Sequence, residues 1–224
     1  MKPTKIQIIE RQVGIRVDVV TQIFSSILNG NIQENDRLVA QKLATQMGVS
    51  ATPIREALAQ LAEMGIVNLI PNRGAICRKF GADQIREVFE IRGILEAEAV
   101  RKFASRYDYE KLSRVRVKIQ LIQANPPDND DWLAEAKKLD TGFHLMIARG
   151  CGNDRLSHEI TRTWSLLNLI HNMVHVDQIH RDRTISEHLE IIEALLQNDG
   201  EKAAHMMRQH IDSASKYTVD SLFT

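Results

Sequence analysis

Cysteine and long apolar runs are both scarce in this sequence of 224 residues. The only cysteines, Cys77 and Cys151, are too few for a disulfide framework and are not spaced as a metal-binding pair. No stretch approaches the roughly 20 uncharged apolar residues that span a bilayer. The first residues, MKPTKIQIIERQ, lack the basic-then-apolar layout of a secretory signal. These absences predict a reduced, cytoplasmic protein that does not bind a membrane.

A net charge of zero leaves the chain without the strong positive charge of many nucleic-acid-binding proteins. The balance hides an asymmetry between two parts of the sequence. Residues 1–80 carry ten Lys and Arg against six Asp and Glu, whereas residues 81–224 carry 19 against 23. A basic first third beside an acidic remainder permits one DNA-facing module, although an excess of four charges does not establish it.

The first 80 residues have the pattern of a small helical domain that ends in a β-hairpin. Residues 1–10 show no firm pattern and are expected to form a loose arm. Apolar spacing and the Gly and Pro positions predict three helices and two strands, over 15–28, 38–47, 52–64, 66–70 and 75–78. Thr52 and Pro53 are expected to be the N-cap and first residue of the third helix. This order predicts a winged helix-turn-helix.

The third helix opens with side chains suited to reading DNA. In a helix-turn-helix this end enters the major groove, where Ser50, Thr52 and Arg55 would reach phosphates or base edges. Arg73 at the hairpin tip would reach an adjacent groove, and Gly74 would let the backbone approach closely. The alternative is a helical domain with an incidental hairpin.

After Gly81 the pattern is helical almost throughout. Helices are expected near 82–106, 109–124, 131–149, 154–176, 182–198 and 201–220. Short connections predict antiparallel neighbours and hence a six-helix bundle. The predicted fold is therefore mostly α, with a winged helix-turn-helix over 1–80 and a helical domain over 81–224.

Four polar residues of the helical domain have the spacing of a metal site. Asp140 and His144 lie four apart, so they share one helix face. His188 and His210 lie 11 residues before and after Asp199, which places them at equal height in an antiparallel hairpin. Together they offer one oxygen and three nitrogen ligands for a divalent transition metal, with Zn²⁺ preferred and Ni²⁺, Mn²⁺ or Fe²⁺ as alternatives. The alternative is four unrelated polar residues.

A second histidine pair forms a competing metal face. His171 and His175 also lie four apart, but no carboxylate accompanies them in the sequence pattern. We expect them to line a pocket rather than to bind a metal.

The run LVAQKLATQMGVSATPIREALAQLAEMGIVNLIPNRGAICRKF resembles the winged helix of the GntR family, with the spacing of its motif intact. The resemblance implies DNA contacts at Gln41, Ser50, Thr52, Arg55, Arg73 and Gly74. One position departs from the family pattern, because Ala51 stands where many members have arginine. That difference removes a charged side chain from the reading helix and leaves Arg55 and Arg73 as the principal charged readers.

Residues from about 83 to 216 are similar to the FCD ligand-binding domain of the FadR branch of that family. The similarity lies in three segments, IRGILEAEAV, LDTGFHLMIARGCGND and SEHLEIIEALLQNDGEKAAHMMRQHI. In metal-containing members an aspartate, a histidine four residues later and two histidines from the last helices hold the ion. All four positions match here, which implies a metal at Asp140, His144, His188 and His210.

The two resemblances imply a transcription regulator and not an enzyme. Its affinity for DNA would respond to a small organic acid bound at the metal. Arg92 is the first candidate for a second anchor of that acid, and Arg162 and Asn168 lie on a helix expected to line the same cavity. The alternative role of Arg92 is an ion pair with Glu96. A homodimer would bind a pseudo-palindromic operator in double-stranded DNA. The rival functions are a purely structural metal and a metal-dependent hydrolase fused to a DNA-binding domain.

Overall fold

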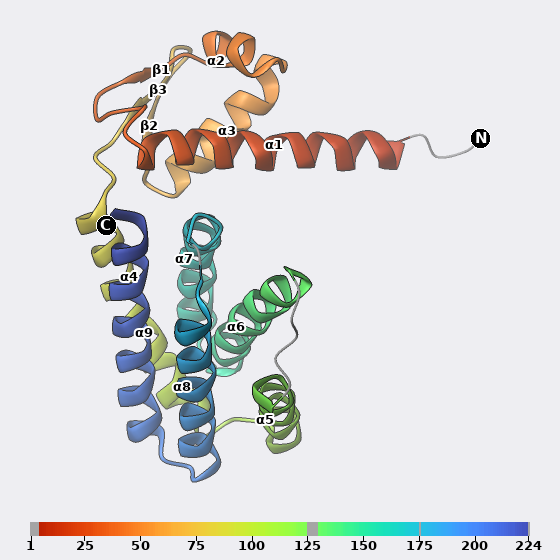
Figure 1. The fold of residues 1–224 in the computed structure, drawn as a ribbon, viewed down its shortest axis with the longest axis vertical. Helices are drawn as coiled ribbons and strands as arrows, with labels where there is room; N and C mark the ends of the chain where they lie inside the picture. The colour runs from red at the N-terminus through yellow and green to blue at the C-terminus, as the bar shows by residue number, and fades with distance from the viewer. Residues whose placement is uncertain (1–4, 125–129, 175, 224) are drawn as a thin grey trace. The chain divides into compact units, whose positions relative to one another are not determined.

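The computed structural model describes residues 5–124, 130–174 and 176–223. The chain divides into two compact units, Met1–Gln84 and Ile85–Thr224. Each unit is described by itself below, with the helices and strands labelled as in Figure 1.

The first unit combines helices with a three-stranded antiparallel sheet. Its elements are α1 (Lys5–Leu28), β1 (Arg37–Leu38), α2 (Ala40–Met47), α3 (Ala51–Glu63), β2 (Val67–Ile70) and β3 (Gly74–Cys77). The strand order is β1-β3-β2, so the hairpin of β2 and β3 is completed by a short strand from the α1–α2 connection. This is the predicted winged helix-turn-helix (Figure 1).

The structure corrects the predicted boundaries around the two central helices. Leu38 does not begin a helix: it pairs with Ala75 in β1, and its side chain is buried. The N-cap of α3 is Ser50 rather than Thr52, and Pro53 stands inside the first turn. A proline is tolerated there because the first four N–H groups of a helix have no intrahelical acceptor.

The first helix is longer than the sequence pattern predicts. The expectation of a loose arm is wrong for residues 5–10, because α1 runs unbroken from Lys5. Glutamine, glutamate and arginine are good helix formers, so continuity needs no apolar periodicity. Residues 1–4 lie outside the described part of the chain.

The core of this unit lies between α1 and α3. Ile23 and Phe24 on α1, and Ile54, Leu58 and Leu61 on α3, are almost completely buried. Burial of each such side chain contributes about 1.5–3 kcal/mol relative to exposure. This apolar layer fixes α3 as a rigid support for the polar side chains on its opposite face.

The second unit is helical throughout its described residues. Its elements are α4 (Ala82–Phe103), which begins at the end of the first unit, α5 (Tyr109–Ala124), α6 (Asp130–Gly150), α7 (Asp154–His171), α8 (Gln178–Leu196) and α9 (Gly200–Phe223). The six predicted helices are all present, but α4 ends three residues early, α7 ends five residues early, α8 begins four residues early and α9 ends three residues late. Asp177 explains the early start of α8, because its side chain accepts a hydrogen bond from the backbone N–H of His180 at 2.7 Å.

A tight turn sets the register of the last two helices. Asn198 has a positive φ of 56°, which ends α8, and the Asp199 side chain accepts the backbone N–H of Lys202 at 2.9 Å at the start of α9. The two helices then run antiparallel and bury Ile191, Leu195 and Met207 between the elements of the core. Residues equally distant from this turn therefore face one another.

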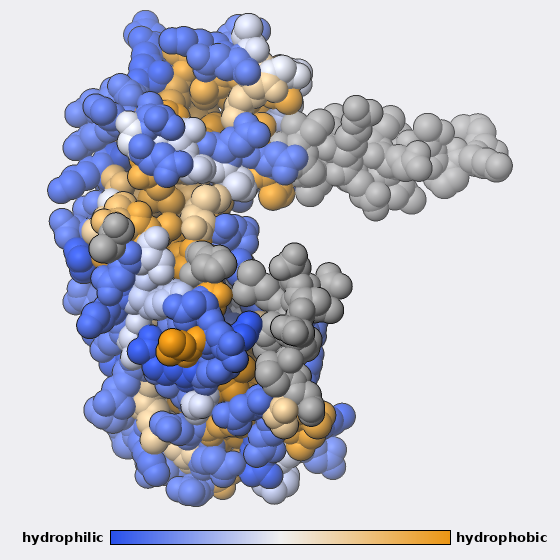
Figure 2. All heavy atoms as spheres, viewed as in Figure 1, coloured by the Kyte–Doolittle hydropathy of each residue, from blue (hydrophilic) through white to orange (hydrophobic). Residues whose placement is uncertain are grey.

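Several large apolar side chains are exposed in the described part of the chain, among them Val17, Leu69, Ile91 and Ile179. On the face shown in Figure 2 hydrophilic residues predominate, with hydrophobic ones in separate patches. Among the described residues, no helix is long and apolar enough to cross a membrane.

Candidate metal centre and DNA-reading groove

The four predicted metal ligands converge in the second unit. Asp140 and His144 come from α6, His188 from α8 and His210 from α9, and one ligand atom of each lies within 4.8 Å of all the others. The three imidazoles are buried, and Asp140 is partly exposed. Residues far apart in sequence thus form one compact His₃Asp cluster.

The spacing of the ligand atoms fits a transition metal. The Nε2 atoms of His144, His188 and His210 form a triangle with all three sides at 3.3 Å. Ligands at the corners of a tetrahedron, about 2.1 Å from a zinc ion, lie about 3.4 Å apart. The Asp140 Oδ1 atom is 3.4 Å from His188 Nε2 and 3.6 Å from His144 Nε2. Four donors of the right chemistry therefore surround one point at metal-ligand spacing.

Two carboxylates fix the protonation of the ring nitrogens. Glu96 contacts Nδ1 of His144, and Glu187 lies 2.7 Å from Nδ1 of His210. A carboxylate only accepts hydrogen bonds, so the proton of each ring lies on Nδ1. This arrangement leaves Nε2 of each ring for a cation, as in carboxylate–histidine–metal chains.

Burial and neighbouring charges keep three of the four groups in forms that bind a metal, whereas His144 must give up a proton when it is charged. Burial lowers the pKa of His188 well below its usual value, and burial lowers the pKa of His210 to about 3. Burial would raise the pKa of Asp140, but His144 and then His188 hold that pKa well below its usual value. Burial also opposes the charged form of His144, yet the Glu96 charge outweighs it and raises the His144 pKa. At neutral pH His188 and His210 are neutral and Asp140 is charged, as metal binding requires.

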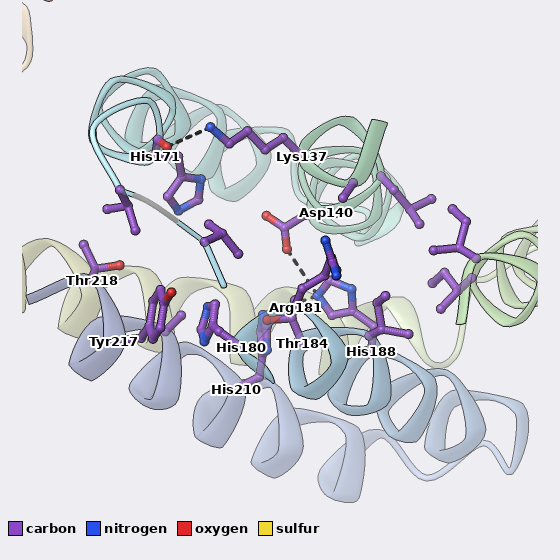
Figure 3. A pocket seen from close by; sticks show the side chains of 18 of the residues that line it. Lys137, Asp140, His171, His180, Arg181, Thr184, His188, His210, Tyr217 and Thr218 are labelled. Carbon is purple, nitrogen blue, oxygen red and sulfur yellow. Dashed lines mark hydrogen bonds and ion pairs between the residues drawn. The ribbon is translucent and has the colours of Figure 1, made fainter. Parts of the chain in front are cut away.

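The cluster forms one wall of a cavity of about 100 Å³. Asp140, His188 and His210 line it, and His144 lies behind them, fully buried. Figure 3 shows Asp140 pointing toward His188, with Lys137 and His171 on the other side of the space. An ion held by the cluster would therefore have one side open to the cavity.

Arg92 lines the same cavity, as the sequence predicts. Its Nε donates to Glu96 Oε1 at 2.8 Å, so the alternative ion pair is also present. The guanidinium lies over the Trp164 ring, 4.6 Å from its centroid. Its Nη2 is buried and has no hydrogen-bond partner among the described residues. Arg92 therefore keeps one unused, buried donor at the wall of the cavity.

The other two predicted effector residues do not line this cavity. Arg162 and Asn168 lie on the exposed face of α7, and Arg162 pairs with Glu159 at 3.1 Å. The prediction that they contribute to the cavity is wrong, because α7 turns Trp164, Leu167 and other apolar side chains inward instead.

The prediction that His171 and His175 line a pocket can be tested for only one of the two residues. His171 lines the cavity, as expected for a pocket residue, whereas His175 lies outside the described residues. Sequence reasoning missed Lys137, whose Nζ donates to the His171 carbonyl at 2.9 Å beside the cavity. Its position three residues before Asp140, on the same helix face, was the available signal.

In the first unit, a surface groove gathers four of the predicted DNA-contacting residues. Gln41 at the start of α2, Arg55 on α3, and Arg73 and Gly74 at the hairpin tip all line it. Arg37 of β1 joins them, and the sequence interpretation missed it because the strand itself was not predicted. The three arginines are exposed, so their charges stand free for phosphates or base edges.

Ser50 and Thr52 are exposed at the N-terminal end of α3, and Ala51 is the first residue of that helix. The backbone N–H groups of this end are directed out of the helix, where a phosphate binds favourably. The end of α3 thus has the geometry that the reading helix requires.

The structure gives a reason why residue 74 is a glycine. Its φ is +95°, and an added Cβ would overlap the carbonyl oxygen of Leu38. The expected role, a close approach of the backbone to DNA, is not needed to explain this glycine. It lets β3 lie against β1 and so holds the wing in place.

Comparisons with known proteins agree with this architecture. The model of bacterial regulatory proteins of the gntR family matches residues 15–76, and the FCD domain model matches residues 87–213. The HTH-type transcriptional repressor GlaR of Escherichia coli (strain K12) is 23% identical over 199 residues, which cover 84% of this chain and 88% of GlaR.

Two solved structures share the fold. One concerns Lar, described as controlling expression of the Listeria monocytogenes agr system: its TM-score is 0.66 at 21% identity, and the match covers 92% of this chain and 96% of that one. The other is the metal-free FCD domain of TM0439, with a TM-score of 0.53 at 19% identity over 65% of this chain and 98% of that one.

The fold and the family matches define a helix-turn-helix DNA-binding transcription regulator with a second, helical domain. The chain belongs to the GntR family of bacterial regulatory proteins, in the group that carries an FCD domain.

Proposed function

We propose that this regulator binds a divalent metal and a small organic acid in its helical unit, and that the acid changes its affinity for operator DNA. The observation that carries the proposal is the His₃Asp cluster in the wall of a cavity. The DNA-reading groove and the metal centre lie in different units, as a switch with separate input and output requires.

Asp140, His144, His188 and His210 would hold the ion. One charged oxygen and three imidazole nitrogens suit Zn²⁺ first, with Ni²⁺, Mn²⁺ or Fe²⁺ as alternatives set by availability. A bound ion would act as a Lewis acid that attracts a carboxylate oxygen. The protein's own contribution is to present the three Nε2 atoms at equal spacing and to leave one side of the cluster open.

The cavity favours a small anion. Its volume of about 100 Å³ is smaller than the roughly 150 Å³ of an engineered cavity that holds benzene, which favours a small acid. Arg92 offers an unused Nη2 donor at the wall, and the partly buried Lys137 adds a second positive charge. Burial lowers the Lys137 pKa, and an anion beside the ammonium would raise that pKa again by stabilising its charged form.

The DNA-reading groove would act in a homodimer. Two copies related by a twofold axis would place two α3 helices on the half-sites of a pseudo-palindromic operator. Because GlaR is named a transcriptional repressor, we propose repression as the default output. The acid shifts operator affinity only as far as it binds the DNA-free and DNA-bound states differently.

The test is an operator-binding titration. A DNA site selected by the protein from a random-sequence library is labelled, and its affinity is measured by fluorescence anisotropy with Zn²⁺, with a chelator, and with Zn²⁺ plus each of a panel of small mono-, di- and hydroxycarboxylates. At least one acid should change the Kd by about 5- to 150-fold, the usual range of allosteric coupling.

Matched variants give the titration its controls. His188→Ala should abolish the response to the acid, whereas His205→Ala, which removes an exposed histidine of α9, should retain it. Identical curves for every acid, with a metal that only stabilises the fold, would favour a structural metal. Turnover of a hydrolysable substrate by the Zn²⁺-loaded protein would favour a hydrolase. Either result contradicts the proposal.

A further inference from the structure

Glu96 on α4 is a buried carboxylate with both oxygens occupied. The side chain is only 2% exposed. Oε1 accepts a hydrogen bond from Arg92 Nε at 2.8 Å, and Oε2 contacts Nδ1 of His144. A buried charge is costly unless it is paired and hydrogen-bonded, so the two partners account for its presence here.

The contact with His144 decides which ring nitrogen carries the proton. Because a carboxylate has no proton to give, it stabilises the form of the ring with the proton on Nδ1. The Nε2 lone pair then faces His188 and His210, each at 3.3 Å. With the proton on Nε2 instead, the His144 ring would present no lone pair to the cluster.

The contact with Arg92 ties the same carboxylate to the cavity wall. Arg92 is held between Glu96 and the face of Trp164, and its remaining Nη2 has no partner among the described residues. An anion that takes the Nη2 hydrogen bond would draw positive charge away from Glu96. Glu96 would then accept more strongly from His144, which makes His144 a stronger ligand.

Glu187 holds His210 in a similar way but from a weaker position. It contacts His210 Nδ1 at 2.7 Å, yet its side chain is 23% exposed. Water can replace part of that interaction, whereas nothing among the described groups can replace Glu96 in its buried position. The two carboxylates should therefore differ in importance.

We propose that Glu96 is the positioning residue of the metal centre, fixing the metal-binding form of His144 and linking it to Arg92 at the cavity wall. The part that concerns metal affinity rests on the proposed function, whereas the form of the His144 ring does not.

The first experiment measures Zn²⁺ affinity of the full-length chain by competition with a chelating indicator, without any acid. Glu96→Gln keeps the shape of the side chain but removes its charge, and should weaken Zn²⁺ binding by about 10- to 100-fold. Glu187→Gln should have a smaller effect. Glu98→Gln, on the same helix at an exposed pair with Arg101, should bind like the unchanged protein. Affinity of Glu96→Gln equal to that of Glu98→Gln would overturn the proposal.

The second experiment reads the ring directly in the metal-free protein. At an alkaline pH that leaves the histidine rings neutral, a ¹⁵N–¹H correlation spectrum of the histidine side chains should show His144 with its proton on Nδ1, and Glu96→Gln should move it wholly or partly to Nε2. An unchanged spectrum would overturn the proposal. If the unchanged protein takes up no Zn²⁺, the proposed function fails, while this spectrum still decides the role of Glu96.

A double variant guards against misfolding. Glu96→Gln leaves Arg92 buried without its counter-charge, so Arg92→Met/Glu96→Leu replaces both charged side chains with apolar ones of similar size and leaves no acceptor beside His144. It should fold, as circular dichroism would show, and should lose Zn²⁺ affinity and the Nδ1 proton in the same way. A double variant that binds Zn²⁺ like the unchanged protein would contradict the role of Glu96.

Discussion

The two units of this regulator place their functional side chains in opposite environments. The first unit keeps Arg37, Arg55 and Arg73 exposed on a rigid support of helix and wing. The second unit buries His144, His188 and His210, and fixes two of them with carboxylates. An exposed reader depends on its scaffold only for position, whereas a buried ligand depends on its neighbours for charge state as well. Changes in the two units should therefore have different consequences.

The largest effect should follow loss of a metal ligand in the buried site. His210→Ala should lose Zn²⁺, which element analysis of the purified protein would detect. At free Zn²⁺ about a thousandfold above its Kd, the metal stabilises the unchanged helical unit by about 4 kcal/mol. Zn²⁺ should therefore raise the unfolding midpoint of the unchanged protein and of His205→Ala, but not that of His210→Ala. An equal rise in all three would contradict the ligand assignment.

Acidification should destabilise the helical unit of the metal-free protein. Burial lowers the pKa of His210 to about 3, of His171 to about 4, and of His188 well below its usual value. In the unfolded chain these histidines have a pKa of about 6.5. Between pH 6.5 and their lower pKa values in the folded chain, the unfolded chain binds protons that the folded chain does not. The free energy of unfolding therefore decreases as the pH is lowered. His144 acts in the opposite sense, because its raised pKa stabilises the folded state as pH falls.

The expected net loss is about 1–3 kcal/mol between pH 6.5 and 5.5, since each histidine contributes at most about 1.4 kcal/mol per pH unit. Urea unfolding followed by tryptophan fluorescence suits this test, because both tryptophans, Trp132 and Trp164, belong to the second unit. A midpoint that rises on acidification would show that His144 outweighs the other three histidines.

A substitution in the wing should destabilise the first unit without changing the metal centre. Gly74→Ala forces a Cβ against the Leu38 carbonyl at a positive φ, and should destabilise the first unit by about 1–3 kcal/mol. Gly30→Ala is the matched control, because its φ of +72° is also positive but nothing lies near the added Cβ. Thermal unfolding should show the larger loss for Gly74→Ala, with Zn²⁺ affinity unchanged in both. Equal losses would mean that the overlap is relieved cheaply.

A comparable change, in DNA binding rather than in folding, should come from single arginines of the groove, and no change from an exposed arginine outside it. Arg55→Ala should weaken binding to the selected operator by about 1–3 kcal/mol, the range of a good base contact. Ala51→Arg adds a charge at the first turn of α3 and should tighten binding or change the preferred sequence. Anisotropy titrations and repeated site selection would measure both. Arg162→Ala, exposed on α7, should change neither DNA binding nor the response to an acid.

Much of the fold could be predicted because helical spacing and turn residues are local signals. The equal distances of His188 and His210 from Asp199 also predicted that these two candidate ligands lie together, since an antiparallel hairpin keeps equal heights. Strand β1 was missed because two residues carry no periodicity, and its existence depends on pairing with β3. The structural role of Gly74 could not be predicted either, because it depends on contact with this unpredicted strand.

The lining of the cavity was harder to predict than the ligands. Arg162 and Asn168 were placed on the right helix but on its exposed face, since the helix alone does not show which side a distant segment covers. Lys137 and Glu96 were missed as parts of the site because their partners, the His171 carbonyl and the His144 ring, come from other helices. Tertiary contacts of this kind have no local signature in the sequence.

The most direct test of the central claim is a crystal structure of the purified protein with anomalous diffraction measured across the absorption edges of Zn, Ni, Fe and Mn. One anomalous peak should lie about 2.1 Å from the Nε2 atoms of His144, His188 and His210. Non-protein density should adjoin it in the cavity beside Arg92. If no peak forms among these residues, even after the crystals are soaked in Zn²⁺, the proposed metal centre is contradicted.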